Sequence, residues 1–418
     1  MLKWVSCFIP TLVAVAGLHA QSKADDFLQK LLIEKGSPLL LNILDKPDSF
    51  RYQLIYTQIN RSKHNNPTFT NYYLHVDKEQ YFNPASTVKL PIALLALEKL
   101  HKLHVPMVDK YTTMLLDSSY SKQTNAWIDS TSENKLPSIA HYTRRIFLIS
   151  DNDAYNRLYE FDGQQYINEA LQKKGYKNTI ITRSFAPMNE DENGHTSQVR
   201  FVNGDHLLYT QPAAYSNFKF DFSKQIKIGN GHLNKNDSLI NQPMDFTTHN
   251  KFALADMQQM LQAVLFPSSV SSSKRFDLSD DDYHFLYKYM SQYPSETIFP
   301  KYDTAEYFDS YTKFFLFKAG KQKIPPYIRV FNKAGWSYGF LTDAAYVVDF
   351  LNGVEFMLTA TIYTNSDGIL NDDKYDYDTI GYPFFEEVGN IIYNYELQRQ
   401  KKNAPDLSRF VIQYDSVK

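Results

Sequence analysis

Residues 82–97 read FNPASTVKLPIALLAL, a stretch that places a serine and a lysine at the start of a strongly apolar segment. The pattern predicts a helix, for which Asn83 is a suitable N-cap and Pro84 fits the first helical position. Ser86 and Lys89 are three residues apart, so a helix brings their side chains together on one face. A neutral lysine here could accept the serine proton, and burial or nearby cations would favour that neutral form. The N–H of Ser86, which lacks an intrahelical partner in the first turn, could donate to a developing oxyanion.

The serine–lysine spacing is not specific by itself, since five other serines in the chain precede a lysine by three residues. Those five pairs lie in polar, loop-like contexts, and only Ser86 and Lys89 open an apolar helix. The simpler alternative is a surface serine and lysine on a core helix.

A second motif, Ser150-Asp151-Asn152, follows the apolar helix predicted over 137–149. Asp and Asn are good N-caps, so capping of the next helix is a sufficient structural explanation. In a functional interpretation, Ser150 could relay a proton and Asn152 could bind a substrate amide.

A third motif, Lys333-Ala334-Gly335, lies between two predicted strands. Small residues after the lysine would let a ligand approach the strand edge, where the lysine could meet a carboxylate. The alternative is a simple turn at an edge strand. The same tripeptide occurs at 318–320, but it is followed by the polar stretch KQKIPP and not by a strand, so we favour Lys333.

The order of elements predicts an α/β (α+β) fold with an antiparallel sheet flanked by helices. Strands are expected near both ends of the chain, and a helical subdomain is expected to be inserted between them. The expected strands are 50–59, 71–76, 327–331, 341–350 and 354–363. The expected helices are 25–33, 84–103, 137–149, 154–161, 166–173, 252–264, 280–290 and 379–398.

Residues 186–245 differ in character from the rest. They are rich in Asn, Asp, Gln, Ser and Gly and show no sustained period. We interpret them as a long loop or insertion on a single domain that spans 21–418, and not as a linker between domains.

Residues 1–20 have the pattern of a cleaved signal peptide, with a short basic start, an apolar run over 4–18 and Ala20 at the cut. The run is too short to span a bilayer, so we expect a secreted or periplasmic protein without a transmembrane anchor. Cys7, the single cysteine, lies in this segment, and the mature chain would therefore contain neither disulfides nor reactive thiols.

The overall composition is that of an ordinary globular protein, with 43% hydrophobic residues and a formal net charge of -2. This charge gives no electrostatic reason to expect nucleic acid as a partner. Aromatic residues are unusually frequent at 15%, and the sequence does not assign them to core or cleft.

The three motifs in this order resemble those of class A β-lactamases and penicillin-binding proteins. The phrase at 82–90 is typical of that family, and Thr247-Thr248 resembles the stretch after the family's Ω-loop. The resemblance covers about residues 25–398. It implies a β-lactamase/transpeptidase-like fold and a serine hydrolase that uses no cofactor and no metal.

By this resemblance, Ser86 is the nucleophile that becomes acylated, and Lys89 accepts its proton or forms part of the proton relay. Ser150 passes a proton to the leaving nitrogen, and Asn152 holds the side-chain amide of the substrate.

The third motif has its own implied roles. Lys333 supports Ser150 and attracts the substrate carboxylate. Gly335 and Trp336 form the substrate-binding edge, where the N–H of Trp336 joins that of Ser86 in the oxyanion hole.

The chain departs from the family at two places. Class A β-lactamases activate the deacylating water with a glutamate in a Glu-Pro-x-x-Asn setting, whereas this sequence has Ala at that place, in 186–189 (APMN). Glu190 and Glu192 lie near but out of register. Ala334 also replaces the usual threonine and removes a hydroxyl that could bind the substrate carboxylate. Acylation is therefore expected, and fast deacylation is not.

Three functions remain open from the sequence. The first is a β-lactamase-like serine hydrolase acting on β-lactams or related amides and esters. The second is a cell-wall D-Ala-D-Ala peptidase or acyl transferase related to penicillin-binding proteins, with a peptidoglycan-derived substrate. The third is a non-catalytic binding protein on the same scaffold. The oligomeric state is not determined.

Overall fold

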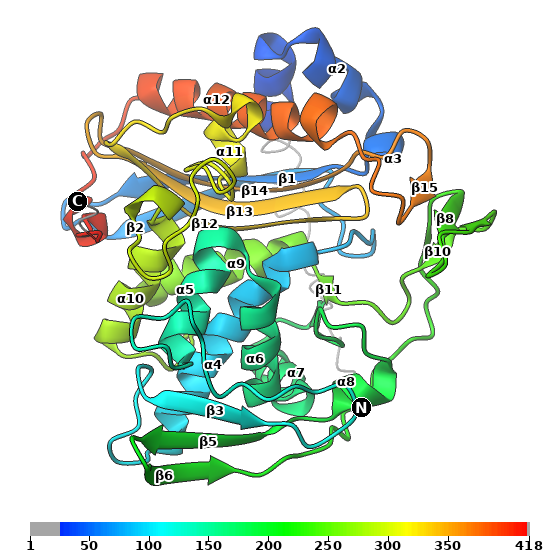
Figure 1. Ribbon diagram of the computed structural model, residues 1–418. Coiled ribbons are helices and arrows are strands. Elements are labelled where there is room, and N and C mark those ends of the chain that lie inside the picture. Colours follow the sequence, from blue (N-terminus) through cyan, green and yellow to red (C-terminus); the bar gives the residue numbers. More distant parts are fainter. Residues whose placement is uncertain (1–25, 416–418) are drawn as a thin grey trace, which may run out of the picture.

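Three apolar stretches near the C-terminus form the centre of the molecule. The computed structural model describes residues 26–415 (Figure 1). Strands β12 (Ile328–Ser337), β13 (Phe340–Asp349) and β14 (Val354–Tyr363) run antiparallel to one another. Every residue of β13 and β14 is buried, because helices cover both faces of the sheet.

Two N-terminal strands complete this sheet, whose order is β12-β13-β14-β1-β2. Strand β1 (Gln53–Arg61) pairs antiparallel with β14, and β2 (Pro67–Leu74) pairs with β1 at the edge. Both ends of the chain thus meet in one antiparallel sheet, and the predicted fold class is confirmed.

Helices form a layer on each side of the sheet (Figure 1). On one face lie a helix over 26–35 and the helices α2 (Pro38–Asp45), α3 (Pro47–Phe50) and α12 (Tyr382–Gln398). The larger inserted region covers the other face, and each side has its own cluster of buried apolar residues. The helices of the inserted region are α4 (Lys89–Leu103), α5 (Ile139–Ile149), α6 (Asn152–Asp162), α7 (Gln164–Lys173), α9 (Leu254–Leu265) and α10 (Asp280–Ser291).

Short elements connect these layers. Two of these short elements are helices, namely α8 (Glu190–Gly194) and the kinked α11 (Phe314–Phe317). A small sheet of β3 (Thr113–Asp117), β5 (Gln198–Asn203) and β6 (His206–Gln211) closes the far end of the helical region. The remaining strands are β4 (Thr179–Ile180), β7 (Lys227–Ile228), β8 (Gly231–Leu233), β9 (Leu239–Ile240), β10 (Met244–Asp245), β11 (Lys251–Phe252) and β15 (Ile369–Leu370).

The structure refines two sequence interpretations. Residues 186–245 are not a plain loop, since they contain α8 and several short strands that pair mostly with one another, while β5 and β8 also pair with β3 and β15 elsewhere in the chain. The helix expected from Pro84 begins as a 3₁₀ turn over Ala85–Val88, and the regular helix starts at Lys89. The reason is Ala85, whose positive φ of 45° cannot continue a helix. The predicted signal peptide lies outside the described residues.

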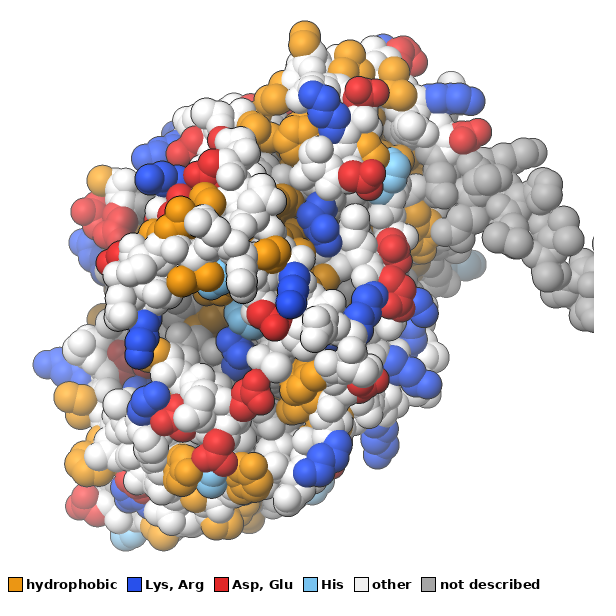
Figure 2. Space-filling view, turned by 90° about the vertical axis from the view of Figure 1, so that its right-hand side faces the viewer, with side chains coloured by type: hydrophobic (Ala, Val, Ile, Leu, Met, Phe, Trp, Pro, Cys, Tyr) orange, Lys and Arg blue, Asp and Glu red, His pale blue; other side chains and the backbone are white. Residues whose placement is uncertain are grey.

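The surface carries charges of both signs. Figure 2 shows acidic and basic side chains interspersed over one face, in keeping with the near-neutral net charge. Within residues 26–415, no helix is both long enough and apolar enough to span a membrane.

Candidate active site

The structure brings Ser86 and Lys89 together at the start of α4. The Lys89 side chain is fully buried, and its Nζ lies 2.8 Å from Ser86 Oγ. Two further acceptors hold the same amino group: Ser150 O at 2.5 Å and Asn152 Oδ1 at 2.6 Å. A neutral amine has two N–H donors and one lone pair. In that neutral form the two carbonyl oxygens can take both donors, which leaves the lone pair for the Ser86 hydroxyl.

Burial is the main reason that the pKa of Lys89 lies well below its usual value, and the nearby Lys333 lowers it further. Asp151 opposes this shift more weakly. Within the described chain, no carboxylate forms an ion pair or hydrogen bond with Lys89. The environment therefore favours the neutral lysine that proton abstraction requires.

The turn before the helix presents the serine. Ala85 occupies the left-handed region, and Asn83 Oδ1 accepts its backbone N–H at 2.8 Å. Such a conformation costs a non-glycine residue roughly 1–3 kcal/mol and persists only where the surroundings enforce it. Here the Thr87 hydroxyl donates to Pro84 O at 2.6 Å and braces the same turn.

Strand β12 packs directly over this turn. A Cβ on Gly335 would lie 2.6 Å from Ser86 N and 2.8 Å from Thr87 N, so only glycine permits this approach. Trp336 follows on the same strand, with its ring 5.7 Å from Tyr311 and 5.8 Å from Phe314.

Ser150 lies between two lysines at the junction of α5 and α6. Its Oγ accepts from Lys333 Nζ at 2.8 Å and lies 3.4 Å from Lys89 Nζ. Ser150 ends α5 with a φ of 62°, and Asp151 caps α6 by accepting from Ala154 N at 2.8 Å. The capping and functional interpretations of this motif are thus compatible, because different residues of the tripeptide serve each.

Behind Lys333 lies a group of buried charges that the sequence did not reveal. Burial lowers the pKa of Lys333 to about 7, with Asp343 opposing the shift and Lys313 adding to it. Asp343 accepts from Asn332 Nδ2 at 2.8 Å and from Phe314 N at 3.2 Å, and burial raises its pKa to about 7. Lys313 is itself buried and donates to Asn332 Oδ1 at 2.7 Å. Such a cluster adjusts the charge of Lys333 without touching a substrate.

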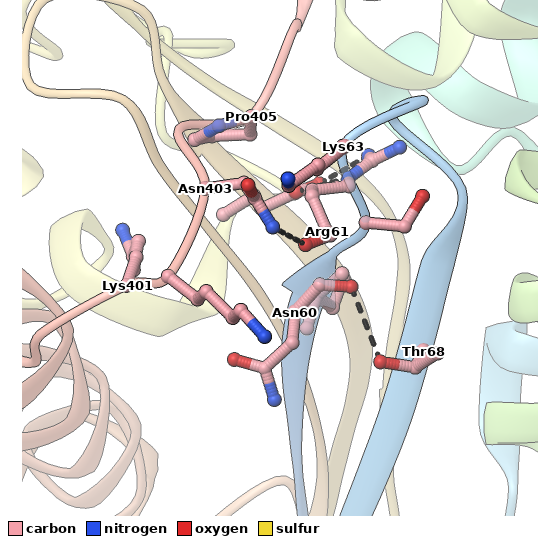
Figure 3. A pocket seen from close by; sticks show the side chains of 11 residues that line it. Asn60, Arg61, Lys63, Thr68, Lys401, Asn403 and Pro405 are labelled. Carbon is pink, nitrogen blue, oxygen red and sulfur yellow. Dashed lines mark hydrogen bonds and ion pairs between the residues drawn. The ribbon is translucent and has the colours of Figure 1, made fainter.

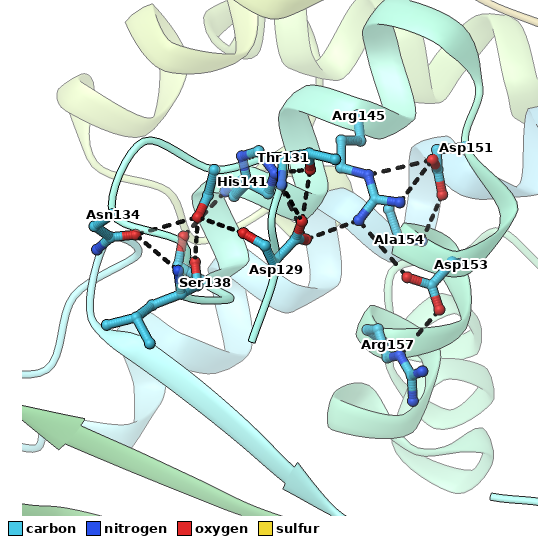
Figure 4. Close-up of polar contacts among 12 residues, drawn as sticks. Asp129, Thr131, Asn134, Ser138, His141, Arg145, Asp151, Asp153, Ala154 and Arg157 are labelled. Atoms are coloured by element: carbon cyan, nitrogen blue, oxygen red, sulfur yellow. Dashed lines mark hydrogen bonds and ion pairs between the residues drawn. The ribbon is translucent and has the colours of Figure 1, made fainter. Parts of the chain in front are cut away.

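A second network fixes the Ser150–Asn152 loop from the outside (Figure 4). Arg145 on α5 forms ion pairs of 2.8 Å with both Asp151 and Asp129. Asp129 also accepts from the Thr131 hydroxyl at 2.6 Å, which contacts His141 Nε2 at 2.7 Å. Sequence inspection missed Arg145, since an arginine near the end of an amphipathic helix gives no distinctive signal.

The segment after α7 lacks the carboxylate that would activate water. Phe185 lies beside the nucleophile pair, with Lys89 Nζ 4.8 Å from its ring centroid. Glu192 instead caps α8 by accepting from Asn189 N at 2.8 Å and pairs with Lys122 at 3.0 Å, while Glu190 is exposed. In residues 26–415, no acid forms a hydrogen bond or ion pair with Ser86 or Lys89.

The second Lys-Ala-Gly tripeptide, at 318–320, lies in a different environment from the one at 333–335. Lys318 is buried, with its amino group within 6 Å of several aromatic rings, and it donates to Tyr311 O at 2.7 Å. Its contacts with Tyr311 and Trp336 brace the wall beside Gly335. Within residues 26–415 it forms no hydrogen bond with Ser86 or Ser150, whereas Lys333 donates to Ser150.

Comparison with known proteins gives a family match and several similar solved structures. The chain matches the model of the β-lactamase enzyme family over residues 57–395. Similar solved structures include the TLA-1 extended-spectrum β-lactamase, at 14% identity and a TM-score of 0.48, over 90% of this chain and 99% of that one. A PBP-A variant in an acyl-enzyme complex with penicillin G has 14% identity and a TM-score of 0.47, over 90% and 96%. A β-lactamase from Xanthomonas campestris pv. campestris has 14% identity and a TM-score of 0.45, over 88% and 98%. No curated protein matches the chain.

The Arg145 network predicts an acid-dependent loss of stability. Burial alone would raise the pKa of Asp129, but hydrogen bonds from His141 and Thr131 and the charge of Arg145 lower it strongly. The stabilisation is therefore complete above the unfolded pKa of about 3.9 and is lost as the pH falls towards the folded value. Asp129→Asn should cost about 3–5 kcal/mol at neutral pH, and urea unfolding should show this difference shrinking in acid.

The matched control is Asp153→Asn. Asp153 is half exposed and lies 3.6 Å from Arg145, so its replacement should cost at most about 1 kcal/mol. A difference for Asp129→Asn that stays constant from neutral to acidic pH would contradict the linkage.

Proposed function

Because the chain belongs to the β-lactamase enzyme family, we propose that it is an exported serine hydrolase acylated on Ser86 by β-lactams or by related amides and esters. The observation that carries this proposal is the Lys89 amino group, 2.8 Å from the Ser86 hydroxyl and held by two carbonyl oxygens. Burial of an amine without a carboxylate contact is costly, and a purely structural serine would not require it.

In the acylation step, Lys89 takes the proton of Ser86 as Oγ attacks the substrate carbonyl carbon. The new Oγ–C bond gives a tetrahedral intermediate, which collapses by breaking the C–N bond. The leaving nitrogen takes a proton from the Ser150 hydroxyl, and Lys89 returns a proton to Ser150 across the 3.4 Å contact. No proton is gained or lost by the enzyme overall.

Backbone N–H groups would stabilise the developing oxyanion. The close packing of Gly335 on the Ser86 turn supports an oxyanion hole between the N–H of Ser86 and that of Trp336. Such donors stabilise charge that develops only in the transition state, and each typically contributes about 10²–10³ in rate.

Two side chains would orient the substrate. Lys333 would attract the substrate carboxylate when its ammonium is charged, and it also holds Ser150 Oγ. Asn152 would donate its amide to the substrate side chain, since its Oδ1 is engaged by Lys89 and its Nδ2 is not.

Deacylation is the weak step of this proposal. The family's water-activating glutamate is replaced by Ala186, and Phe185 lies next to Lys89. Loss of a general base typically slows a step by about 10²–10⁴. The acyl-enzyme should therefore accumulate.

The same observation favours a second candidate, a cell-wall D-Ala-D-Ala peptidase or acyl transferase. In that chemistry an amine can replace water as the acceptor, and it needs less activation because it is the stronger nucleophile. The third candidate is a non-catalytic binding protein. The buried Lys89 amino group, 2.8 Å from Ser86 Oγ, argues against it, because binding alone does not require this pair.

Acylation predicts a covalent adduct. Incubation of the mature protein with a fluorescent penicillin should give a long-lived mass increase on Ser86, with deacylation slower than acylation by about 10²–10⁴. Intact-mass and peptide-mass analysis over time measures both steps. Release that is faster with an amine acceptor than with water would favour the acyl transferase.

Three variants serve as controls. Ser86→Ala should give no adduct, whereas Glu190→Gln and Glu192→Gln should release the acyl group at the wild-type rate. An unlabelled Ser86 in the wild-type protein would exclude β-lactam acylation, and slower release in either glutamate variant would show that the deacylating base had been misassigned.

The pKa of Lys333 predicts that the acylation rate constant falls at alkaline pH, which gives the pH profile an alkaline limb. Its pKa of about 7 means that the ammonium is present below neutrality and lost above it. The second-order acylation constant for a carboxylate-bearing β-lactam should fall roughly 10- to 100-fold above that pH, since hydrogen bonds to charged groups contribute about 1.5–3 kcal/mol. Stopped-flow measurement across pH tests this.

An uncharged ester substrate should lack that limb, because it has no carboxylate for Lys333 to attract. Lys333→Arg, whose guanidinium keeps its charge, should remove the limb for the β-lactam as well. An identical alkaline limb with both substrates would assign the titration to another group.

The close packing of Gly335 predicts that a larger residue there displaces the Ser86 turn. In Gly335→Ala the new Cβ would meet two backbone nitrogens, so β12 must move away from Ser86. Acylation should fall by about 10²–10³, as for loss of an oxyanion donor, and stability by about 1–3 kcal/mol. Gly204→Ala, in the β5–β6 turn with nothing within 4 Å of its Cβ, should acylate normally. Wild-type acylation in Gly335→Ala would contradict the packing argument.

A further inference from the structure

A cavity of about 510 Å³ lies between the β1–β2 hairpin and the chain that follows α12 (Figure 3). Its lining comes from the hairpin, from Glu355 on β14 and from residues 401–405. None of the lining residues belongs to the Ser86, Ser150 or Lys333 motifs, so this cavity is separate from the candidate active site.

The two walls of the cavity are joined to each other. Asn403 Nδ2 donates to Arg61 O at 2.7 Å, and the Thr68 hydroxyl donates to Asn60 O at 3.3 Å within the hairpin (Figure 3). Lys401 Nζ donates to Gly353 O at 2.8 Å and fixes the C-terminal wall to the β13–β14 turn. The cavity is therefore formed before any ligand arrives.

The two buried acids at this cavity, Glu355 and Glu396, are already neutralised, and the remaining nearby acid, Asp406, is exposed to solvent. Glu355 is buried and receives Arg61 at 2.6 and 2.7 Å, and the Tyr346 hydroxyl donates to it at 2.8 Å. Glu396 pairs with Arg399 at 2.8 Å and accepts from the Tyr56 hydroxyl. Neither carboxylate has a free charge to offer to another cation.

Two lysines remain without such a match. In the described part of the chain, Lys63 and Lys402 form no ion pair and no side-chain hydrogen bond. Lys401 lies 3.9 Å from Glu396, which Arg399 already holds. The Lys401 amino group turns away from the hairpin towards Gly353 (Figure 3). The positive charge that the two walls offer to the cavity is therefore that of Lys63 and Lys402.

We propose that this cavity binds a ligand that bears a phosphate group, with Lys63 and Lys402 as its charge partners. A phosphate carries more charge than a carboxylate and suits two ammonium groups that approach from different directions. The volume is in the range of small-molecule sites and leaves room for an organic part. The aliphatic stems of the lysines and the ring of Pro405 offer that part an apolar contact.

Two sources of the phosphate can be separated by experiment. The probes are glycerol phosphate as a soluble phosphate ester, and vesicles of phosphatidylglycerol against vesicles of phosphatidylcholine. Calorimetry on the full mature protein measures the first, and co-sedimentation measures the second. Binding of glycerol phosphate assigns a soluble ligand, and binding of phosphatidylglycerol vesicles alone assigns a lipid headgroup.

The variant Lys63→Gln/Lys402→Gln should weaken binding of whichever probe the wild-type protein binds, at least about tenfold. The reason is that a hydrogen bond to a charged group contributes about 1.5–3 kcal/mol. Lys63→Arg/Lys402→Arg should retain it. The matched control is Lys235→Gln/Lys323→Gln, which removes two exposed lysines that do not line the cavity.

The proposal is overturned if the wild-type protein binds neither probe, or if the two glutamine pairs weaken binding equally, because the effect would then follow net charge alone. Penicillin labelling of Ser86 should be unchanged in all of these variants. This outcome separates failure of the second site from failure of the proposed function.

Discussion

The amino group of Lys89 is the point on which the functional part of the molecule depends. It is fully buried, and its hydrogen-bond contacts come from three places: the Ser86 turn, the end of α5 and the start of α6. An amine in this position cannot be hydrated, so its hydrogen-bond partners must be supplied by the fold. The same contacts that satisfy the lysine therefore set the positions of Ser86, Ser150 and Asn152 relative to one another.

The sheet completes this arrangement through Lys333 and Gly335. Lys333 reaches Ser150 from β12, and Gly335 lets that strand approach the Ser86 turn. The surrounding charges are unusual, since Lys89, Lys313 and Lys333 are all buried and Asp343 lies among the latter two. Like charges and low solvation keep these lysines easily deprotonated, which suits proton transfer more than stability. The buried network is thus costly for folding, and the rest of the core must stabilise it.

Aromatic side chains account for much of that supporting structure. Tyr155 and Tyr159 on α6 are buried, and their hydroxyls donate to Arg183 O and Asn193 O at 2.9 Å. They hold the segment in which Ala186 replaces the expected glutamate. Others, around Trp336 and Lys318, form the wall beside Gly335. The aromatic excess is therefore divided between core and cleft wall, and in both places ring packing is combined with polar anchoring.

The sequence alone determined the fold class, and it placed the candidate site residues in three ordered motifs. The apolar strands at both ends, the apolar helix after Ser86 and the ordered motifs are local patterns, and local patterns can be recognised residue by residue. It also shows Ala186 at the place where the family resemblance leads one to expect a glutamate. Only the tertiary structure revealed Arg145, Phe185, Lys313 and Asp343, and only it showed that Ala85 interrupts the helix start. These features arise from contacts between residues far apart in the chain. Burial and charge proximity give such residues their properties, and neither is written in the neighbouring sequence.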